Sequence, residues 1–231
     1  MERYSKNLLI KDFGIEGQKA LTQAKVLVVG AGGLGSPCLL YLASAGIGTI
    51  GIVEYDVVDY SNLQRQILYS EEQVGSSKLS IAKTKLQQLN SEIKINTYSI
   101  TLNKSNARAL FLNYDFIIDC TDNIETKYLI NDLCVELEKP FSYGSVVGMQ
   151  GQLFTYMPGH FTLRDFFGPP PSIEKQIKAS NSGILGSIAG MAGSIQATET
   201  IKYFTQIGHL LTDRLLLIHG EDFSIQVLNM R

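Results

Sequence analysis

One stretch constrains the fold of this chain more than any other, because it combines an apolar run with closely spaced glycines. Residues 26–29 are Val-Leu-Val-Val, and residues 30–36 are Gly-Ala-Gly-Gly-Leu-Gly-Ser. The apolar run is typical of a buried parallel strand. Gly30, Gly32 and Gly35 have the G-x-G-x-x-G spacing, and the Leu- and Ala-rich segment that follows indicates a helix. A strand, a tight turn and a helix N-terminus together predict a phosphate site, because the helix start offers free N–H groups.

Each of the three glycines has its own predicted role. Gly30 permits the tight turn, Gly32 lets a phosphate approach the backbone, and Gly35 lets the helix pack close to the strand. Taken alone, the spacing suits a dehydrogenase as well as an ATP-dependent enzyme. The residues that follow must therefore decide between these classes.

Strand and helix patterns alternate along the first 140 residues. Strands are predicted over residues 26–29, 49–53, 93–98 and 116–118, and helices over residues 37–45, 77–90, 105–112 and 124–138. Such alternation, at ~20–30 residues per unit, is typical of a doubly wound parallel sheet with right-handed crossovers. The fold class is therefore α/β, with a Rossmann-like, doubly wound and mostly parallel sheet.

The two ends of the chain depart from this pattern. Residues 2–23 are amphipathic and predict a helix broken near Gly14 and Gly17, packed outside the sheet or on another subunit. After Pro140, strands are predicted over 141–147, 152–156, 215–218 and 224–228, which suggests an antiparallel C-terminal extension. Residues 158–182 predict a long crossover loop, and residues 183–204 predict a buried helix of small residues. No repeat or linker divides the chain, so we expect one domain over residues 1–231.

Composition excludes several classes of protein. The formal net charge of −2 gives no electrostatic reason to expect a nucleic acid partner. No apolar run approaches the roughly 20 residues that span a bilayer, and the N-terminus has no signal-peptide pattern, so we expect a cytoplasmic protein. The three cysteines, Cys38, Cys120 and Cys134, predict free buried thiols, and none has the C-x-x-C spacing of a zinc site.

Charged residues follow the predicted strands where a ligand of an open α/β sheet would bind. Glu54 and Asp56 come after the second strand and are candidates for the ribose hydroxyls, although one of them could simply cap the next loop. Arg65, Lys78 and Asp122 could hold a triphosphate with Mg²⁺, since cations bind phosphate oxygens and a carboxylate binds the metal. Singly, the two cations could lie on a solvated face and Asp122 could be a helix N-cap; together they favour a triphosphate over hydride transfer.

Several of these motifs also occur, in the same order, in a known family. They are Arg3-Tyr4-Ser5 with Gly14 and Gly17-Gln18, residues 28–37 with Gly33, residues 61–66 (Ser-Asn-Leu-Gln-Arg-Gln), Val74-Gly75 with Lys78, residues 119–123 (Asp-Cys-Thr-Asp-Asn), Gly151-Gln152 and residues 183–202. Nearly end to end, the chain resembles the ThiF/MoeB family, the bacterial relatives of ubiquitin-activating enzymes.

The resemblance implies an activity. Members bind ATP and Mg²⁺ together with the C-terminal Gly-Gly tail of a small ubiquitin-like sulfur carrier of thiamin or molybdopterin biosynthesis. The tail carboxylate attacks the α-phosphate, pyrophosphate leaves, and an acyl-adenylate remains. Charge neutralisation and fixed geometry are needed, because both reactants are anionic. The expected enzyme is thus an adenylyltransferase.

The resemblance also implies site roles. The turn with Gly30, Gly32, Gly33 and Gly35 would bind nucleotide, Glu54 the ribose, Arg65 and Lys78 the phosphates, and Asp122 the Mg²⁺, while Asn62 and Gln64 would help place the phosphates. The family works as a homodimer in which a basic residue of the partner's N-terminal arm reaches the ATP. Lys6 stands at that position, where arginine is more usual, and lysine lacks the bidentate fork.

The chain departs from the family pattern in two places. Thr162-Leu163-Arg164-Asp165 stands where many members have a first C-x-x-C pair, and the sequence ends at Arg231 before a second, so no structural zinc is expected. The crossover has no cysteine, the nearest equivalent being about Ala179. We therefore expect the reaction to stop at the adenylate. Adenylation of a peptide or small carboxylic acid, a non-catalytic nucleotide-binding partner protein and, more remotely, an NAD-binding oxidoreductase remain as alternatives.

Overall fold

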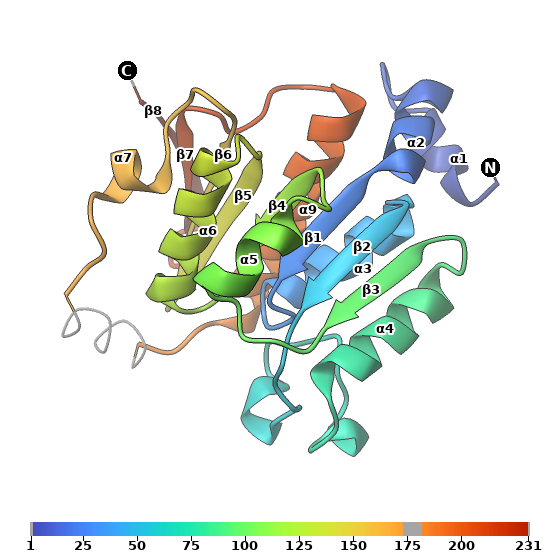
Figure 1. The fold of residues 1–231 in the computed structure, drawn as a ribbon, viewed down its shortest axis with the longest axis horizontal. Coiled ribbons are helices and arrows are strands. Elements are labelled where there is room, and N and C mark those ends of the chain that lie inside the picture. Colours follow the sequence, from blue (N-terminus) through green and yellow to red (C-terminus); the bar gives the residue numbers. More distant parts are fainter. Residues whose placement is uncertain (1, 173–181, 231) are drawn as a thin grey trace.

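An eight-stranded sheet forms the centre of the computed structural model, which describes residues 2–172 and 182–230 (Figure 1). The strand order is β3-β2-β1-β4-β5-β6-β7-β8. The strands are β1 (Lys25–Val29), β2 (Thr49–Val53), β3 (Lys94–Tyr98), β4 (Phe116–Asp119), β5 (Phe141–Val147), β6 (Gln150–Tyr156), β7 (Arg214–His219) and β8 (Ser224–Asn229). Strands β3, β2, β1, β4 and β5 are parallel, and β5 to β8 are antiparallel. The predicted fold class is confirmed, including the antiparallel extension.

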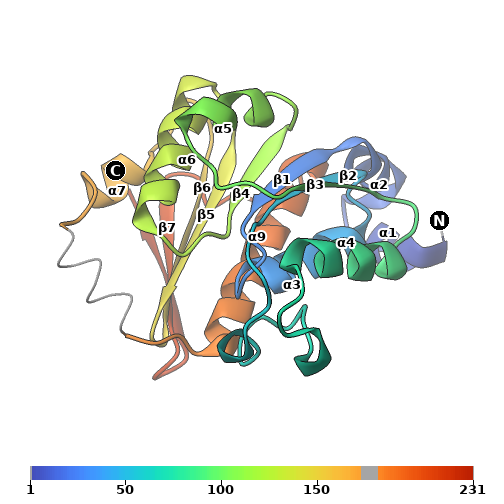
Figure 2. The same cartoon turned by 60° about the horizontal axis from the view of Figure 1, so that its bottom comes forward.

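Helices cover both faces of the sheet, as a doubly wound fold requires (Figure 2). The helices are α1 (Ser5–Leu8), α2 (Gly14–Gln23), α3 (Gly35–Ala45), α4 (Lys78–Leu89), α5 (Lys104–Phe111), α6 (Ile124–Glu136), α7 (Leu163–Phe167) and α9 (Gly186–Thr205). One apolar core lies between the sheet and α3, α4 and α9, and a second lies between the sheet and α5, α6 and α7.

The register places the glycine turn at the middle of one sheet edge. Val26 of β1 pairs with Ile50 of β2 on one side and with Phe116 of β4 on the other. Strand β1 is therefore central, and its apolar residues are buried because helices cover both faces. The carboxyl ends of β1, β2 and β4 meet at the same edge, where the predicted site residues follow each strand.

Helix α9 is buried, as its small residues predict. It packs against α3, β5 and β6, and Ala189, Ala192 and Ala197 on it have no more than 1% exposure. A Cβ on Gly193 would overlap the carbonyl oxygen of Leu34 in the glycine turn, and one on Gly186 would overlap that of Gln64. The close approach of α9 to these backbones offsets the cost of glycine within a helix.

Two local predictions were wrong. The N-terminal helix is interrupted before Gly14 but not at Gly17, which is buried inside α2. The ring of Phe13 packs so closely on Gly17 that an added Cβ would come 3.2 Å from it. The crossover 158–182 is not one loop: Thr162 caps the short helix α7, since its hydroxyl accepts from the backbone of Asp165. The rest of that prediction, and the position of Ala179, lies outside the described residues.

Candidate functional site

A cavity of about 1440 Å³ opens at the carboxyl ends of β1, β2 and β4. Its walls come from the glycine turn, the end of β2, the loop before α4, the loops after β3 and β4, helix α5 and one side of α6 along its whole length. Among the lining residues are Gly30, Gly32, Gly33, Glu54, Asp56, Arg65, Lys78 and Asp122. The structure thus brings together eight residues that the sequence nominated from separate segments.

The glycine turn has the backbone geometry that its sequence predicts. Gly30 has a φ of +94°, and a Cβ at this position would come 2.7 Å from the carbonyl oxygen of Cys120. Gly35 begins α3 and lies against the carbonyl of Gly30, so a side chain has no room there. The turn therefore directs the N-terminus of α3 toward the cavity, where a helix favours an anion.

The peptide groups of Ala31 are held on both sides. Its N–H donates to Glu54 Oε2 at 3.0 Å, and its carbonyl accepts from the Tyr69 hydroxyl at 2.9 Å. Burial raises the pKa of Tyr69 far above its usual range, so the phenol stays protonated and remains a donor. The turn is consequently rigid at Ala31, while Gly32 and Gly33 face the cavity.

The two acidic residues that could bind the ribose differ in exposure and in their hydrogen-bond and ion-pair partners. Glu54 is 8% exposed, and its Oε1 accepts from the N–H groups of Tyr55 and Asp56 at 2.8 and 3.0 Å. Its carboxylate is thus fixed by three backbone donors, including that of Ala31, beside the cavity. Asp56 is half exposed and pairs with Lys78, whose Nζ lies 3.2 Å from Asp56 Oδ2. Glu54 is therefore the better oriented acceptor.

The two cations reach the cavity from different elements. Lys78 is the first residue of α4, and its side chain is 5% exposed. Arg65 lies in the loop before α4 and donates from one guanidinium nitrogen to the Ser61 carbonyl at 3.1 Å. Ser77 caps α4 by accepting from the Ser80 N–H at 3.3 Å, which fixes where Lys78 emerges.

Asp122 is not the N-cap of α6. Asn123 is the capping residue, because its Oδ1 accepts from the Thr126 N–H at 2.9 Å. In the part of the chain that the structure describes, the exposed Asp122 carboxylate has no hydrogen-bond or ion-pair partner. Its carboxylate is therefore available to a ligand in the cavity.

Four nominated residues, Gly35, Asn62, Gln64 and Lys6, do not line this cavity. Gly35 lies instead against the carbonyl of Gly30. The Asn62 side chain accepts instead from the Asp59 N–H at 3.4 Å, and Gln64 is exposed on the outside of the same loop. Lys6 is exposed on α1 at the amino ends of the strands, the opposite edge of the sheet. The neighbouring Tyr4 holds this arm there, since its hydroxyl contacts Asn90 and Glu92 just before β3.

Sequence reasoning gave no role to Gln66, Asp119 or Lys127. Gln66 lines the cavity, and its buried Oε1 has no hydrogen-bond partner among the described residues. Asp119 and Lys127 form a buried ion pair directly behind the loop of Asp122. Lys127 shares one face of its helix with buried Ile130, Asn131 and Cys134, and this spacing is the signal that could have revealed it.

The predicted character of the three cysteines is confirmed. Cys38, Cys120 and Cys134 are free and buried. Burial raises the pKa of the Cys120 and Cys134 thiols well above the usual value, so they are not thiolates near neutral pH. Residues 162–165, which stand at the position of the absent first C-x-x-C pair, form the N-cap and first residues of α7. No cluster of three potential metal ligands occurs in the described ranges 2–172 and 182–230.

The sheet, the glycine turn and the charged cavity define a nucleotide-binding α/β protein of the doubly wound class. The ThiF family model matches residues 4–231, and the chain belongs to the ThiF family. None of the described helices is long and apolar enough to cross a membrane.

Its relatives include named enzymes. The chain is 44% identical over 230 residues to "Adenylyltransferase and sulfurtransferase MOCS3" of Anopheles gambiae, covering 99% of this chain and 52% of the relative. It is equally identical to MOCS3-1 of Zea mays, with 99% and 49% covered. Thus the chain spans about half the length of the curated relatives it matches. It is a homologue of adenylyltransferases.

A solved structure has the same fold. E. coli MccB with ATP matches with a TM-score of 0.87 and 26% identity, covering 99% of this chain and 71% of that one. ATP therefore binds to a homologue with this fold.

Proposed function

We propose that this chain is an ATP- and Mg²⁺-dependent adenylyltransferase that activates the C-terminal Gly-Gly carboxylate of a small ubiquitin-like sulfur carrier. The observation that carries the proposal is the convergence of Glu54, Arg65, Lys78 and Asp122 on one cavity beside the glycine turn. Relatives named adenylyltransferase and sulfurtransferase, at 44% identity, support it. Thiamin and molybdopterin biosynthesis are both candidate pathways for this activity. That the chain forms one domain and that the protein is cytoplasmic both stay predictions.

The residues around the cavity suit ATP with Mg²⁺. The backbone at Gly30 and Gly35 leaves no room for side chains and brings the α3 N-terminus to the cavity, as a polyphosphate requires. Within the described ranges, Gln66 has a buried oxygen without a hydrogen-bond partner, and Asp122 has a carboxylate without an ion-pair partner. Mg²⁺ commonly binds through one or two carboxylates together with substrate phosphates, so a lone Asp122 is a sufficient protein ligand.

In the proposed reaction, a tail carboxylate oxygen attacks the α-phosphorus of ATP, and the bond from that phosphorus to the oxygen bridging to the β-phosphate breaks. Pyrophosphate leaves, and an acyl-adenylate remains. Arg65 and Lys78 neutralise the phosphates, so that an anionic attacker can approach. The Glu54 carboxylate accepts hydrogen bonds from the ribose hydroxyls. Mg²⁺ on Asp122 would offset the charge that develops on the leaving pyrophosphate.

Three further roles belong to the proposal. Asn62 and Gln64 would approach the phosphates only if their loop moves on binding, since neither lines the cavity here. Lys6 would act on the ATP of a second copy in a homodimer, because its own arm is fixed at the opposite edge of the sheet.

The test is ATP–pyrophosphate exchange with purified protein, Mg²⁺ and each candidate Gly-Gly-tailed carrier in turn. Exchange that depends on one carrier is the expected result, and it would identify the substrate as well. A carrier whose terminal Gly-Gly is removed is the matched control. Binding of ATP without exchange, whichever carrier is added, would refute the proposed substrate.

A second candidate is adenylation of a peptide or a small carboxylic acid. E. coli MccB, at 26% identity, has been solved with both AMPCPP and MccA, which is the observation that favours this candidate. Exchange with such an acid in the absence of any carrier would support it. A non-catalytic nucleotide-binding partner protein would bind ATP and catalyse exchange with neither class of acceptor.

A further inference from the structure

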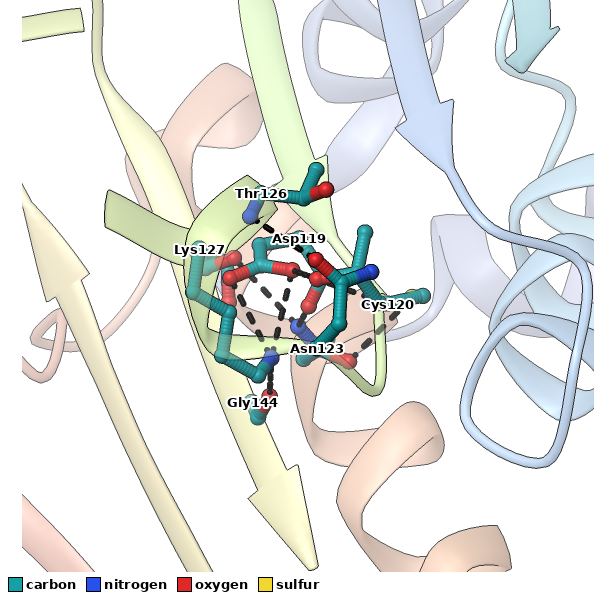
Figure 3. Close-up of polar contacts among 9 residues, drawn as sticks. Asp119, Cys120, Asn123, Thr126, Lys127 and Gly144 are labelled. Carbon is teal, nitrogen blue, oxygen red and sulfur yellow. Dashed lines mark hydrogen bonds and ion pairs between the residues drawn. The ribbon is translucent and has the colours of Figure 1, made fainter. Parts of the chain in front are cut away.

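A buried lysine lies directly behind the loop that carries Asp122. Lys127 Nζ is 3.2 and 3.3 Å from the two carboxylate oxygens of Asp119 and 2.6 Å from the carbonyl oxygen of Gly144 (Figure 3). The side chains are 3% exposed for Lys127 and 0% for Asp119. One ammonium group therefore connects helix α6 to the end of β4 and to the middle of β5.

The contacts of Asp119 continue toward the cavity. Its Oδ1 also accepts from the N–H and the hydroxyl of Thr121, at 3.0 and 2.6 Å. Thr121 immediately precedes Asp122, and Asn123 on the other side is fixed as the cap of α6. Both neighbours of Asp122 are thus held in place.

Strand β4 is held from the opposite layer as well. Gln196 of α9 donates from Nε2 to the backbone carbonyl of Asp119 at 2.8 Å and to that of Ser142 at 3.3 Å. Lys127 holds the side chain of Asp119 from the α6 layer, and Gln196 holds its backbone from the α9 layer. The end of β4 therefore has little freedom to shift.

Stability alone is a poor explanation for this pair. Burying two charges costs several kcal/mol per ion, and apolar residues of similar volume are often as stable or more so. What an apolar pair cannot do is accept the two hydrogen bonds of Thr121. With Asp119 retained for those bonds, Lys127 is needed to neutralise it, because Asp119 would otherwise be a second uncompensated carboxylate behind Asp122.

We propose that Lys127 is a positioning residue for Mg²⁺-ATP: it orients and neutralises Asp119, which sets the turn at Thr121 and presents Asp122 to the metal. This inference rests on the proposed function, in that Asp122 is the metal ligand. Removal of partners that orient a metal ligand typically lowers metal affinity about 10–100-fold.

The test is calorimetric titration of the full chain with ATP over a series of Mg²⁺ concentrations. In Lys127→Met, the Mg²⁺ concentration for half-maximal enhancement of ATP binding should rise about tenfold or more, and Lys127→Arg should restore most of the loss. Lys139→Met is the matched control, because Lys139 donates at 2.7 Å to the Tyr114 carbonyl at the far end of β4. It should leave the Mg²⁺ dependence unchanged.

Thr121→Val supplies an independent variant if Lys127→Met does not fold. It removes only the hydroxyl that donates to Asp119 and should also raise the required Mg²⁺ concentration. A folded Lys127→Met with wild-type Mg²⁺ dependence would overturn the inference, and so would Thr121→Val with wild-type dependence if Lys127→Met does not fold. The proposed function fails differently: the wild type would then show Mg²⁺-dependent ATP binding without pyrophosphate exchange.

Discussion

At the scale of single residues, the site depends on which of several neighbouring polar side chains makes the contacts that stabilise the fold. Asn123 caps α6 and Asp119 takes the buried lysine, so Asp122 between them keeps its carboxylate for a ligand. After β2 the arrangement differs, because Glu54 is fixed by backbone donors, Asp56 pairs with Lys78, and both line the cavity. Of these two loops, only the loop after β4 leaves an acid without a partner among the described residues.

Asp122→Ala should abolish adenylation and leave the fold intact. The side chain is exposed and has no partner in the described structure, so its removal should hardly change the melting temperature. Pyrophosphate exchange should fall about 100-fold or more, because the proposed Mg²⁺ ligand is lost. Glu221→Ala, at an exposed position in the turn before β8, is the control and should keep full exchange. Full activity in Asp122→Ala would show that the metal assignment is wrong.

The cysteines lead to a second prediction at this scale. Burial raises the pKa of Cys120 and Cys134, and all three thiols are buried, so the native protein should not react with an aromatic disulfide reagent at pH 8. All 3 thiols should react after unfolding in guanidinium chloride. A fast-reacting thiol in the native protein would contradict this and would reopen a covalent intermediate on this chain.

At the scale of elements, α9 supports the glycine turn by direct backbone contact. Gly193 lies against the Leu34 carbonyl, and Gly33 would bring a Cβ within 3.3 Å of Ala189. The turn is therefore held between α9 and the sheet. A displacement of α9 should consequently shift the glycine turn and weaken nucleotide binding.

Two glycines of α9 test this with opposite expected signs. Gly193→Ala should destabilise the protein by about 1–3 kcal/mol, because the new methyl overlaps a carbonyl oxygen, and should weaken ATP binding. In Gly190→Ala, the new Cβ would have no described atom within 4 Å outside its own stretch of helix backbone, so the substitution should stabilise the helix by up to about 1 kcal/mol without a change in ATP binding. Urea unfolding and calorimetry measure both. Equal effects of the two substitutions would show that α9 does not support the turn.

The elements that the sequence predicted are those that local patterns determine. Apolar periodicity and glycine spacing placed the strands and most helices, and charged residues after strands β2 and β4 indicated the cavity. The role of Lys127 was not predicted, because its partners Asp119 and Gly144 come from two other elements that only the tertiary fold brings together. Gly17 was misjudged because the packing of Phe13, not the propensity of glycine, decides its place in α2.

At the scale of the whole molecule, the nominated residues lie on two opposite edges of the sheet. The glycine turn, Lys78 and Asp122 are at the carboxyl edge, whereas Lys6 is at the amino edge, where Tyr4 is tied to Asn90. One chain cannot bring Lys6 to its own cavity without releasing that arm. A role for Lys6 in the site therefore requires a second copy.

Mixing two inactive variants tests whether sites are shared between copies. Lys6→Ala and Asp122→Ala should each lose most exchange activity as separate proteins. If Lys6 acts across a twofold dimer, a heterodimer has one site with both residues intact, so random reassortment of equal amounts should restore about a quarter of wild-type exchange. Mixed Lys78→Met and Asp122→Ala chains are the control, because these residues line the same cavity and no heterodimer site is intact. A monomeric protein, or a dimer whose activity does not recover on mixing, would show that Lys6 has no role in the site.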